Sequence, residues 1–208
     1  MPVPVVHSNT DHSYDSDSDP GSEVEALKTA EVEEIDTPDL PELTDRAAVY
    51  AGSCLGLSAP LVAHLQSLLP KAPALTLSIG SGFGLLEALL LDEAHAVVGV
   101  EVQPSPNTYL PATNHRIVHG TRFLDPLAAK AEAWLFVYPR RVALVDEYMA
   151  AHSSRNLHTI IWAGPHADWN DYKPCFAAGW HVQTQSAQEV GGKAWELIAV
   201  AHRLPKQP

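Results

Sequence analysis

From residue 74 onward, short apolar runs alternate along the chain with segments whose apolar residues recur every three or four positions. The apolar runs have the length of β-strands, and the segments between them have the spacing of a helix with one buried face. The expected strands are residues 74–79, 96–102, 115–120, 134–139 and 157–164. The expected helices are residues 84–94, 125–133 and 140–152, and the segment 168–179 starts like a helix. This alternation predicts an α/β fold in which helices cover both faces of a mostly parallel sheet.

The last two apolar segments depart from this alternation. Residues 180–190 and 193–204 are both strand-like, and only Gly191 and Gly192 lie between them. Because no helical segment separates the two strands, they are expected to pair antiparallel at the end of the sheet. With the five preceding strands, they predict a seven-stranded sheet that closes with an antiparallel hairpin.

Residues 44–70 also carry apolar residues at helical spacing. Thr44 followed by Asp45 matches the start of a first helix, and Ser58 followed by Pro60 matches the start of a second. Four leucines would share one face of the second helix: Leu61, Leu65, Leu68 and Leu69. Two helices are therefore expected before the first strand.

The N-terminal region has a different composition. The first 45 residues contain 13 of the 25 Asp and Glu residues and a single Lys. Since dense negative charge with few large apolar residues cannot be buried, residues 1–43 are expected to form an acidic disordered tail and residues 44–208 the folded domain. The simpler role for this tail is to keep the protein soluble. Serines 13, 16, 18 and 22, which lie among acidic residues, also fit a docking arm for a partner that phosphorylation regulates.

Charge and cysteine content exclude several classes of function. Residues 46–208 carry 12 acidic and 12 basic residues. This balance argues against a dedicated binder of duplex nucleic acid, which needs clustered cations to neutralise phosphates, and it leaves RNA open as a substrate. No segment approaches ~18 uncharged apolar residues, and no signal peptide is recognisable, so no membrane association is expected. Cys54 and Cys175 match no metal-ligand spacing, and we expect a metal-free protein of the cytoplasm or nucleus.

Three glycines interrupt the apolar pattern where the first strand meets its helix. Gly80, Gly82 and Gly84 occupy every second position of "SIGSGFG", at the carboxyl end of a strand, where open α/β sheets bind their ligands. Glycine there permits positive φ and close approach of a ligand to the backbone. Glu101 ends the next strand, and its carboxylate can accept hydrogen bonds from both hydroxyls of a ribose. These features together predict a site for a nucleoside-containing cofactor, although the glycines alone also fit a tight turn.

The glycine spacing distinguishes between two classes of cofactor. The dinucleotide motif G-x-G-x-x-G would place its third glycine at position 85, which is Leu85. The spacing G-x-G-x-G and the closing hairpin instead resemble the Rossmann-like class I S-adenosylmethionine-dependent methyltransferases, over residues 58–204. The resemblance implies that S-adenosylmethionine is the cofactor, with the glycine loop around its methionine moiety and ribose and the acid on the ribose hydroxyls. The residues so implied are Gly80, Ser81, Gly82, Gly84 and Glu101.

Three positions depart from the pattern of this family. Ser78 stands where many members carry an acid that helps to position the amino end of the cofactor. Thr121 stands near the end of the third strand, where an Asp often contacts adenine, and its hydroxyl can make a hydrogen bond of its own. Tyr138 and Pro139 supply an aromatic residue and a turn after the fourth strand, without the Asn or Asp that many amine methyltransferases have there. The resemblance therefore supports the cofactor more strongly than any particular acceptor.

Methyl transfer from a sulfonium depends mainly on placing a nucleophile in line and, for a weak nucleophile, on removing its proton. The candidate catalytic residues are Tyr138 after the fourth strand and His166 and Asp168 after the fifth. The same stretch also fits a plain loop in which Asp168 caps a helix and Trp169 packs inward. The acceptor, a small molecule or a protein, is not identified.

Three other functions remain open from the sequence. A binding or scaffold protein could have kept the fold and lost catalysis, as the departures at Ser78 and Thr121 suggest. A nicotinamide-dependent oxidoreductase is disfavoured by Leu85 and the hairpin. A non-methylating enzyme of a biosynthetic pathway could also use this fold.

Overall fold

A computed structural model describes residues 37–176 and 179–205 of the 208-residue chain. Most of the expected acidic tail, residues 1–36, lies outside the described residues, so its predicted disorder stays a prediction. Residues 37–43 are described, and they form neither helix nor strand.

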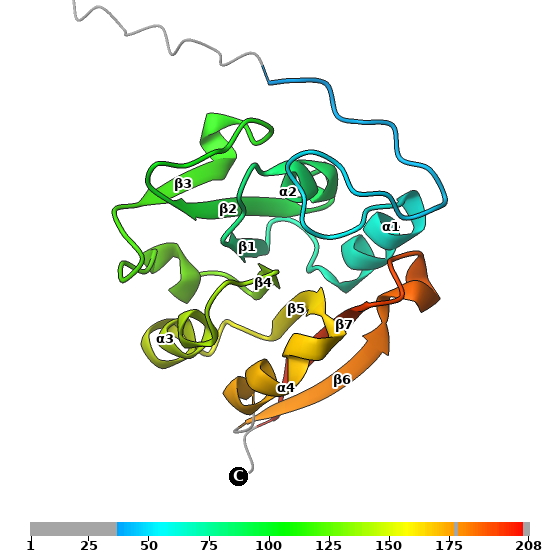
Figure 1. Ribbon diagram of the computed structural model, residues 1–208. Coiled ribbons are helices and arrows are strands. Elements are labelled where there is room, and N and C mark those ends of the chain that lie inside the picture. Colours follow the sequence, from blue (N-terminus) through cyan, green and yellow to red (C-terminus); the bar gives the residue numbers. More distant parts are fainter. Residues whose placement is uncertain (1–36, 177–178, 206–208) are drawn as a thin grey trace, which may run out of the picture. The chain divides into compact units, whose positions relative to one another are not determined.

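Seven strands form one sheet in the order β3-β2-β1-β4-β5-β7-β6 (Figure 1). The strands are β1 Leu75–Ile79, β2 Ala96–Val102, β3 His115–Val118, β4 Ala133–Val137, β5 Thr159–Pro165, β6 Trp180–Ser186 and β7 Glu196–Arg203. The first five run parallel, whereas β7 lies between β5 and β6 and pairs antiparallel with both. The predicted mostly parallel sheet with a terminal antiparallel hairpin is confirmed.

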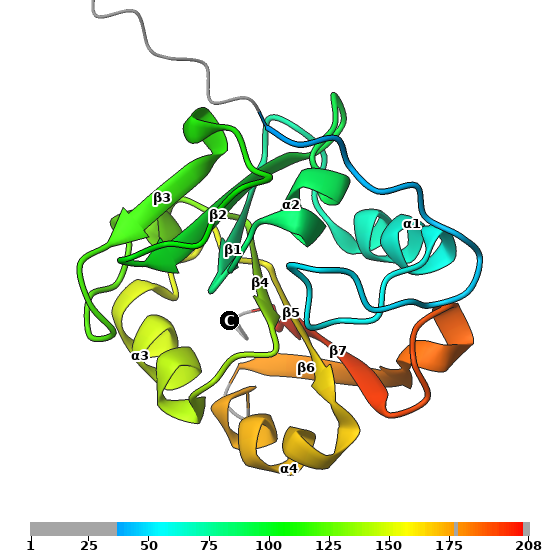
Figure 2. The same ribbon diagram turned by 45° about the horizontal axis from the view of Figure 1, so that its top comes forward.

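Helices cover both faces of this sheet, as the sequence predicts (Figure 2). The α-helices are α1 Ala59–Leu68, α2 Leu85–Leu90, α3 Val142–His152 and α4 Trp169–Tyr172. Short 3₁₀ helices are Ala112–Asn114, Pro126–Ala129, His166–Asp168, Lys173–Phe176 and Ala187–Val190. Helices α1 and α2 pack on one face of the sheet, and α3 and α4 pack on the other.

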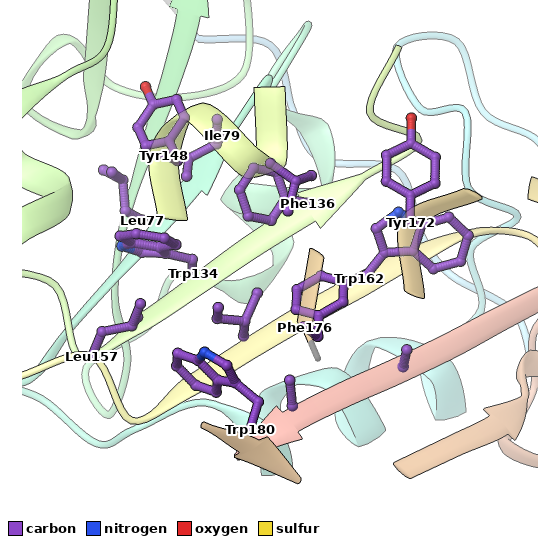
Figure 3. Close-up of a cluster of buried hydrophobic side chains, with 14 of the residues drawn as sticks. Leu77, Ile79, Trp134, Phe136, Tyr148, Leu157, Trp162, Tyr172, Phe176 and Trp180 are labelled. Carbon is purple, nitrogen blue, oxygen red and sulfur yellow. The ribbon is translucent and has the colours of Figure 1, made fainter. Parts of the chain in front are cut away.

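The alternation of side chains along each strand divides the core between the two faces. In β5, Ile160 and Trp162 belong to the cluster under α3 and α4, whereas Ile161 and Ala163 belong to the cluster under α1 and α2. This division follows from the strand geometry, because successive side chains point to opposite faces. The α3 and α4 side is rich in aromatic rings from several elements, including Trp134, Phe136, Tyr148 and Tyr172 (Figure 3).

The start of α1 agrees with its sequence signal. The Ser58 hydroxyl accepts a hydrogen bond from the Leu61 amide at 3.2 Å, and Pro60 lies in the first turn. Leu61 and Leu65 are fully buried against the sheet. The second predicted helix is therefore confirmed.

The helix predicted from Thr44 is wrong. Residues 44–57 form an irregular segment in which Ala48 and Leu57 pair as an isolated antiparallel bridge. Gly52, at φ +93°, lies within a turn of the segment, and the Gly56 amide donates to the Glu196 carboxylate at 3.0 Å. The bridge within the segment and the bond to Glu196, which is 140 positions from Gly56, outweigh a weak helical preference.

Several other predicted elements are shorter than their patterns suggest. The helix expected over residues 84–94 ends at Leu90, and the strand expected over residues 115–120 ends at Val118. The helix expected over residues 125–133 is only the 3₁₀ turn Pro126–Ala129, because β4 begins at Ala133 and the chain must first turn into the sheet. The segment that starts like a helix forms the single α-helical turn Trp169–Tyr172 and then the 3₁₀ turn Lys173–Phe176. The strand expected over residues 180–190 ends at Ser186, whose hydroxyl accepts from the Gln188 amide at 3.3 Å and starts a 3₁₀ turn.

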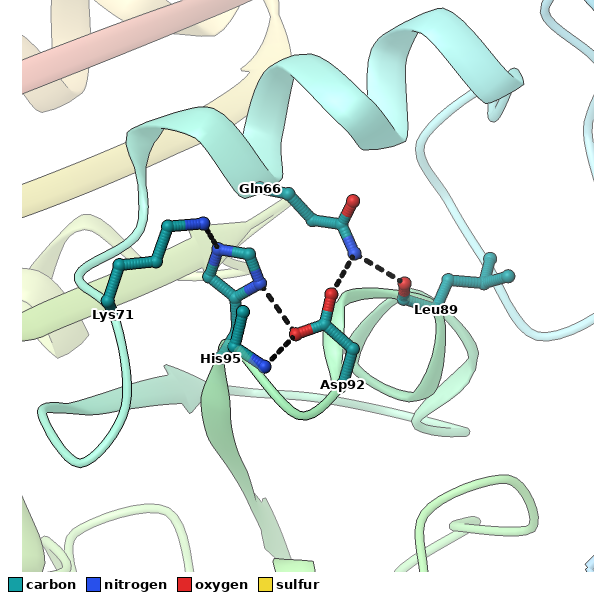
Figure 4. Close-up of polar contacts among 6 residues, drawn as sticks. Gln66, Lys71, Leu89, Asp92 and His95 are labelled. Carbon is teal, nitrogen blue, oxygen red and sulfur yellow. Dashed lines mark hydrogen bonds and ion pairs between the residues drawn. The ribbon is translucent and has the colours of Figure 1, made fainter.

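A polar cluster connects the turn between α2 and β2 with α1 and with the segment before β1 (Figure 4). Buried His95 lies between Lys71 and Asp92, with its Nε2 2.9 Å from Lys71 Nζ and its Nδ1 2.8 Å from Asp92 Oδ1. Since an ammonium can only donate, Nε2 accepts and Nδ1 carries the proton that is donated to Asp92. Gln66 joins this cluster from α1 through Asp92 Oδ2 at 3.3 Å. His95 directly precedes β2, so the cluster lies at the amino ends of the parallel strands and has a structural role.

Candidate functional site

A cavity of about 650 Å³ opens at the carboxyl ends of β1 to β4, where this class of sheet binds its ligands. Its volume lies within the range of small-molecule and cofactor sites. The wall includes residues from all four strand ends, namely Ile79, Val102, Val118 and Val137. Gly52, Ser53 and Cys54 of the irregular N-terminal segment also line it.

The three glycines of the loop have two different roles. All three have positive φ, at +83° for Gly80, +58° for Gly82 and +79° for Gly84. A Cβ atom on Gly80 or Gly82 would meet nothing within 4 Å, whereas one on Gly84 would lie 2.4 Å from Asn107 Oδ1. Gly84 is therefore needed for packing against the segment after β2. Gly80 and Gly82, which line the cavity, leave space that a ligand can occupy.

Ser81 has its side chain packed against β2. It is 7% exposed, and a Cβ atom on Gly99 would lie 2.7 Å from its Oγ. The Ser81 amide donates to the Val100 carbonyl at 3.1 Å. Gly99 is thus required for the close approach of the loop to β2. This role was not identified from the sequence, although a glycine within a strand often marks such a contact.

Glu101 connects the end of β2 to the glycine loop. Its Oε2 accepts from the Gly82 amide at 2.7 Å, and its Oε1 accepts from the Val102 amide at 2.8 Å. A carboxylate offers about four acceptor positions, so about two remain for a ligand in the cavity. The bond to Gly82 also places Glu101 at the predicted loop, which its sequence position alone could not establish.

The segment after β3 forms another part of the wall. Thr121 is exposed and lines the cavity, and its carbonyl accepts from Arg141 Nη2 at 2.7 Å. Arg141 also binds the Glu147 carboxylate at 3.0 Å, which fastens this segment to α3. Nearby wall residues are apolar: Val102, Pro104, Pro106, Val118 and Phe123. An apolar wall of this kind suits a flat ring better than a charged group.

A buried acid also lines the cavity. Glu87 in α2 is 2% exposed, and its Oε1 accepts from the Ser78 hydroxyl at 2.5 Å. Burial raises the pKa of Glu87 to about 7; the Ser78 hydrogen bond opposes this rise, and the charge of Glu101 adds to it. Glu87 was not identified from the sequence, although a glutamate inside the apolar stretch "LLEALLL" indicates a buried acid.

Tyr138 has a left-handed backbone conformation, and its hydroxyl is already hydrogen-bonded. Its φ is +47°, and its hydroxyl donates to Glu196 Oε1 at 2.8 Å. Burial and then the Glu196 contact raise the pKa of Tyr138. Buried Glu196 also accepts from the Gly56 and Lys193 amides, so it joins the N-terminal segment, the end of β4 and the start of β7. Glu196 was not identified from the sequence.

The other two catalytic candidates lie in the 3₁₀ turn after β5. His166 and Asp168 are both exposed, and the Asp168 side chain makes no capping bond to α4. Asp168 lines a second cavity of about 420 Å³, together with Tyr138 and Trp162, whereas His166 does not line it. Trp169 is buried, as expected if this stretch is a plain loop in which Trp169 packs inward. The structure thus brings Asp168 and Tyr138 to one cavity and leaves His166 outside its wall.

The described residues, 37–176 and 179–205, show two further absences. They contain no group of three His, Cys, Asp or Glu side chains placed to hold a metal ion. None of their helices is long and apolar enough to cross a membrane.

Comparison with known proteins identifies the fold. The sequence matches no family model and no curated protein. Among solved structures, the precorrin-6y C5,15-methyltransferase from Geobacter metallireducens is similar at a TM-score of 0.53 and 13% identity, over 76% of this chain and 94% of that one. The tRNA methyltransferase TrmI from Aquifex aeolicus gives 0.53 and 9% identity, over 72% and 70% of the two chains. A chain in the complex of the Haloferax volcanii activator Trm112 with a methyltransferase gives 0.52 and 13%, over 72% and 90%.

The domain therefore has the Rossmann-like fold of class I S-adenosylmethionine-dependent methyltransferases. At these identities the similarity concerns the fold alone. The residues of the cavity fit such a cofactor in three respects: open space at Gly80 and Gly82, acceptor capacity at Glu101, and an apolar wall after β2 and β3.

Proposed function

We propose that this protein binds S-adenosylmethionine in the 650 Å³ cavity and transfers its methyl group to an acceptor. The observation that carries the proposal is the arrangement of Gly82 and Glu101, which are joined by a 2.7 Å hydrogen bond at the wall of one cavity. It places unused carboxylate acceptors beside a loop that leaves space for a ligand. Two hydroxyls of a ribose match those acceptors.

In the proposed reaction the sulfonium of the cofactor supplies an already activated methyl group. The protein has to bind the cofactor and orient it. Glu101 holds the ribose, and the backbone at Gly80 and Gly82 allows the rest of the molecule to approach closely. The apolar wall that ends at Phe123 takes the base, with Thr121 at its edge. The task of these residues is positioning, which is the main requirement for this transfer.

The acceptor is proposed to bind in the second cavity. Tyr138, Pro139 and Arg140 line both cavities, so a group bound in one lies next to a group bound in the other. The Tyr172 hydroxyl donates to the Pro139 carbonyl, which fixes the loop between them. Asp168 is the candidate base of this cavity.

One observation favours a second candidate function, a binding or scaffold protein without catalysis. The Tyr138 hydroxyl is already bound to Glu196, and His166 lies outside both cavity walls. Only Asp168 then remains as a proton acceptor among the three catalytic candidates. Methyl transfer to an acceptor that needs no base would be compatible with this arrangement.

Replacing Glu101 with alanine should weaken binding of S-adenosylhomocysteine by about 1–3 kcal/mol, because two ribose hydroxyls lose their acceptor. Isothermal titration of the full chain with S-adenosylmethionine and S-adenosylhomocysteine measures this change. Glu93→Ala, at an exposed acid in the turn before β2, is the matched control and should bind as the wild type does. Equal affinity in all three proteins would exclude the assigned site, and no binding to the wild type would favour the scaffold function.

The two cysteines allow the location of the bound cofactor to be tested in the wild-type protein. Cys54 is exposed and lines the cavity, whereas burial, followed by the contact with Asp146, raises the pKa of Cys175 to about 12. Since the thiolate is the reactive form, N-ethylmaleimide should alkylate Cys54 much faster than Cys175. Bound S-adenosylhomocysteine should slow alkylation of Cys54 and leave Cys175 unchanged. Mass spectrometry of the peptides over time gives both rates, and unprotected Cys54 at saturating ligand would contradict the proposed location.

A further inference from the structure

Glu87 is a buried carboxylate without a cationic partner. Within residues 37–176 and 179–205, the ion pairs involve Asp92, Asp125 and Glu147, and none involves Glu87. Among the described residues, its single side-chain partner is the Ser78 hydroxyl, which satisfies one of about four acceptor positions. An acid in such a place is costly when ionised, unless a cation comes close to it.

The position of Glu87 gives that cation a route of access. Glu87 lines the same cavity as Glu101 but approaches it from α2, while Glu101 approaches it from β2. Both acids are tied to the region of the glycine loop, since Glu101 accepts from the Gly82 amide and Glu87 accepts from the hydroxyl of Ser78, two residues before Gly80. One cavity therefore presents the free acceptor positions of Glu101 and the uncompensated acid of Glu87 at two different places of its wall.

We infer that Glu87, held by Ser78, binds the α-amino group at the amino-acid end of the cofactor. This inference rests on the proposed function. A ligand with a ribose at Glu101 extends past Gly80 and Gly82, and an ammonium at its far end reaches Glu87. An ammonium supplies both the positive charge and the several N–H donors that this carboxylate lacks.

The binding should depend on pH in a defined direction. The groups that face Glu87 are Ser78 on β1 and Glu101 on β2, and Cys54 of the N-terminal segment lines the same cavity. Because the pKa of Glu87 is about 7, it is mostly protonated at pH 6 and mostly ionised at pH 8. Affinity for a ligand that carries the ammonium should rise with pH across this window, by up to about tenfold.

The test compares two nucleosides that differ in the amino-acid end. S-Adenosylhomocysteine carries the α-amino group, and methylthioadenosine has the same base, ribose and sulfur without it. Wild-type full chain should bind S-adenosylhomocysteine more tightly at pH 8 than at pH 6 and methylthioadenosine equally at both. Glu87→Gln should lower the affinity for S-adenosylhomocysteine at pH 8 by about tenfold or more and remove its pH dependence. Its affinity for methylthioadenosine should change less than about twofold.

A second variant tests the role of the hydroxyl. Ser78→Ala removes the hydrogen bond that lowers the pKa of Glu87, so the rise in affinity for S-adenosylhomocysteine should move to higher pH. A merely structural role of Ser78 would not move this midpoint.

The outcomes separate the two proposals. If Glu87→Gln weakens both nucleosides equally, or changes neither, the assignment of Glu87 is overturned and the cofactor site stands. If wild-type protein binds neither nucleoside at either pH, the proposed function fails and this inference fails with it. Circular dichroism and the melting temperature of each variant show whether it is folded.

Discussion

Glu87→Gln should make the unliganded protein more stable at pH 8.5 by about 3 kcal/mol. Glu87 is 2% exposed, and burial raises its pKa from an ordinary 4.5 to about 7. The unfolded chain therefore loses this proton at a lower pH than the folded protein does. The stability of the wild type falls between pH 4.5 and 7 on account of this group and stays lowered above pH 7. Glutamine keeps an acceptor for Ser78 and carries no charge, so the variant lacks this loss.

Urea denaturation of both proteins at pH 4, 6 and 8.5 measures the difference in unfolding free energy. The difference should be small at pH 4, grow through pH 6 and reach its full value above pH 8. Glu93→Gln, at an exposed acid, should follow the wild type at every pH. A constant offset between Glu87→Gln and the wild type would show that packing, and not ionisation, distinguishes them. Saturating S-adenosylhomocysteine should reduce the advantage of the variant, because the ammonium compensates the charge of Glu87 in the wild type.

Gly82→Val should weaken binding of S-adenosylhomocysteine by about a hundredfold or more, which corresponds to about 3 kcal/mol. Gly82 has φ +58° and lines the cavity, and a Cβ atom there points into open space. A branched side chain would fill the volume that the ligand needs and would hinder the close approach that glycine permits. The folded domain should survive, with a loss of about 1–3 kcal/mol from the left-handed backbone.

Gly179→Val is the matched control for this substitution. Gly179 also has positive φ, at +81°, and open space around its Cβ position, but it lies just before β6 and does not line the cavity. Titration and thermal unfolding should give similar losses of stability for the two variants and a loss of binding for Gly82→Val only. Normal binding by Gly82→Val would remove the glycine loop from the proposed site.

Local residues carry enough information for part of the site. The positions of Gly80, Gly82 and Glu101 at the wall of the cavity could be predicted, because they depend on backbone freedom and on a strand end, both of which are local properties, and their role toward a cofactor stays a prediction. The direction of Ser81 could not be identified, since it depends on the space that Gly99 leaves on another strand. The pairing of Ser78 with Glu87 likewise joins a strand to the following helix across the loop.

The helices also differ in whether local residues or contacts with other elements decide where they begin and end. Ser58 predicted the start of α1 because a cap is satisfied within one turn. Thr44 failed as a helix start, because the segment after it is held by Leu57 and by Glu196, which is distant in sequence. The helix expected after Asp125 is short because the chain has to enter β4.

The alternation of strands and helices, the closing hairpin and the glycine-rich turn followed by an acid follow from periodicity or from the conformational limits of single residues, so they could be predicted before folding is considered. The position of β7 between β5 and β6 and the joining of three segments by Glu196 are visible only in the folded chain. The same holds for the origin of the buried acid of the cavity, which comes from α2. These features depend on contacts between residues that are far apart in the chain. Such contacts can form, and can stabilise the fold, only when the strands of the sheet have come together.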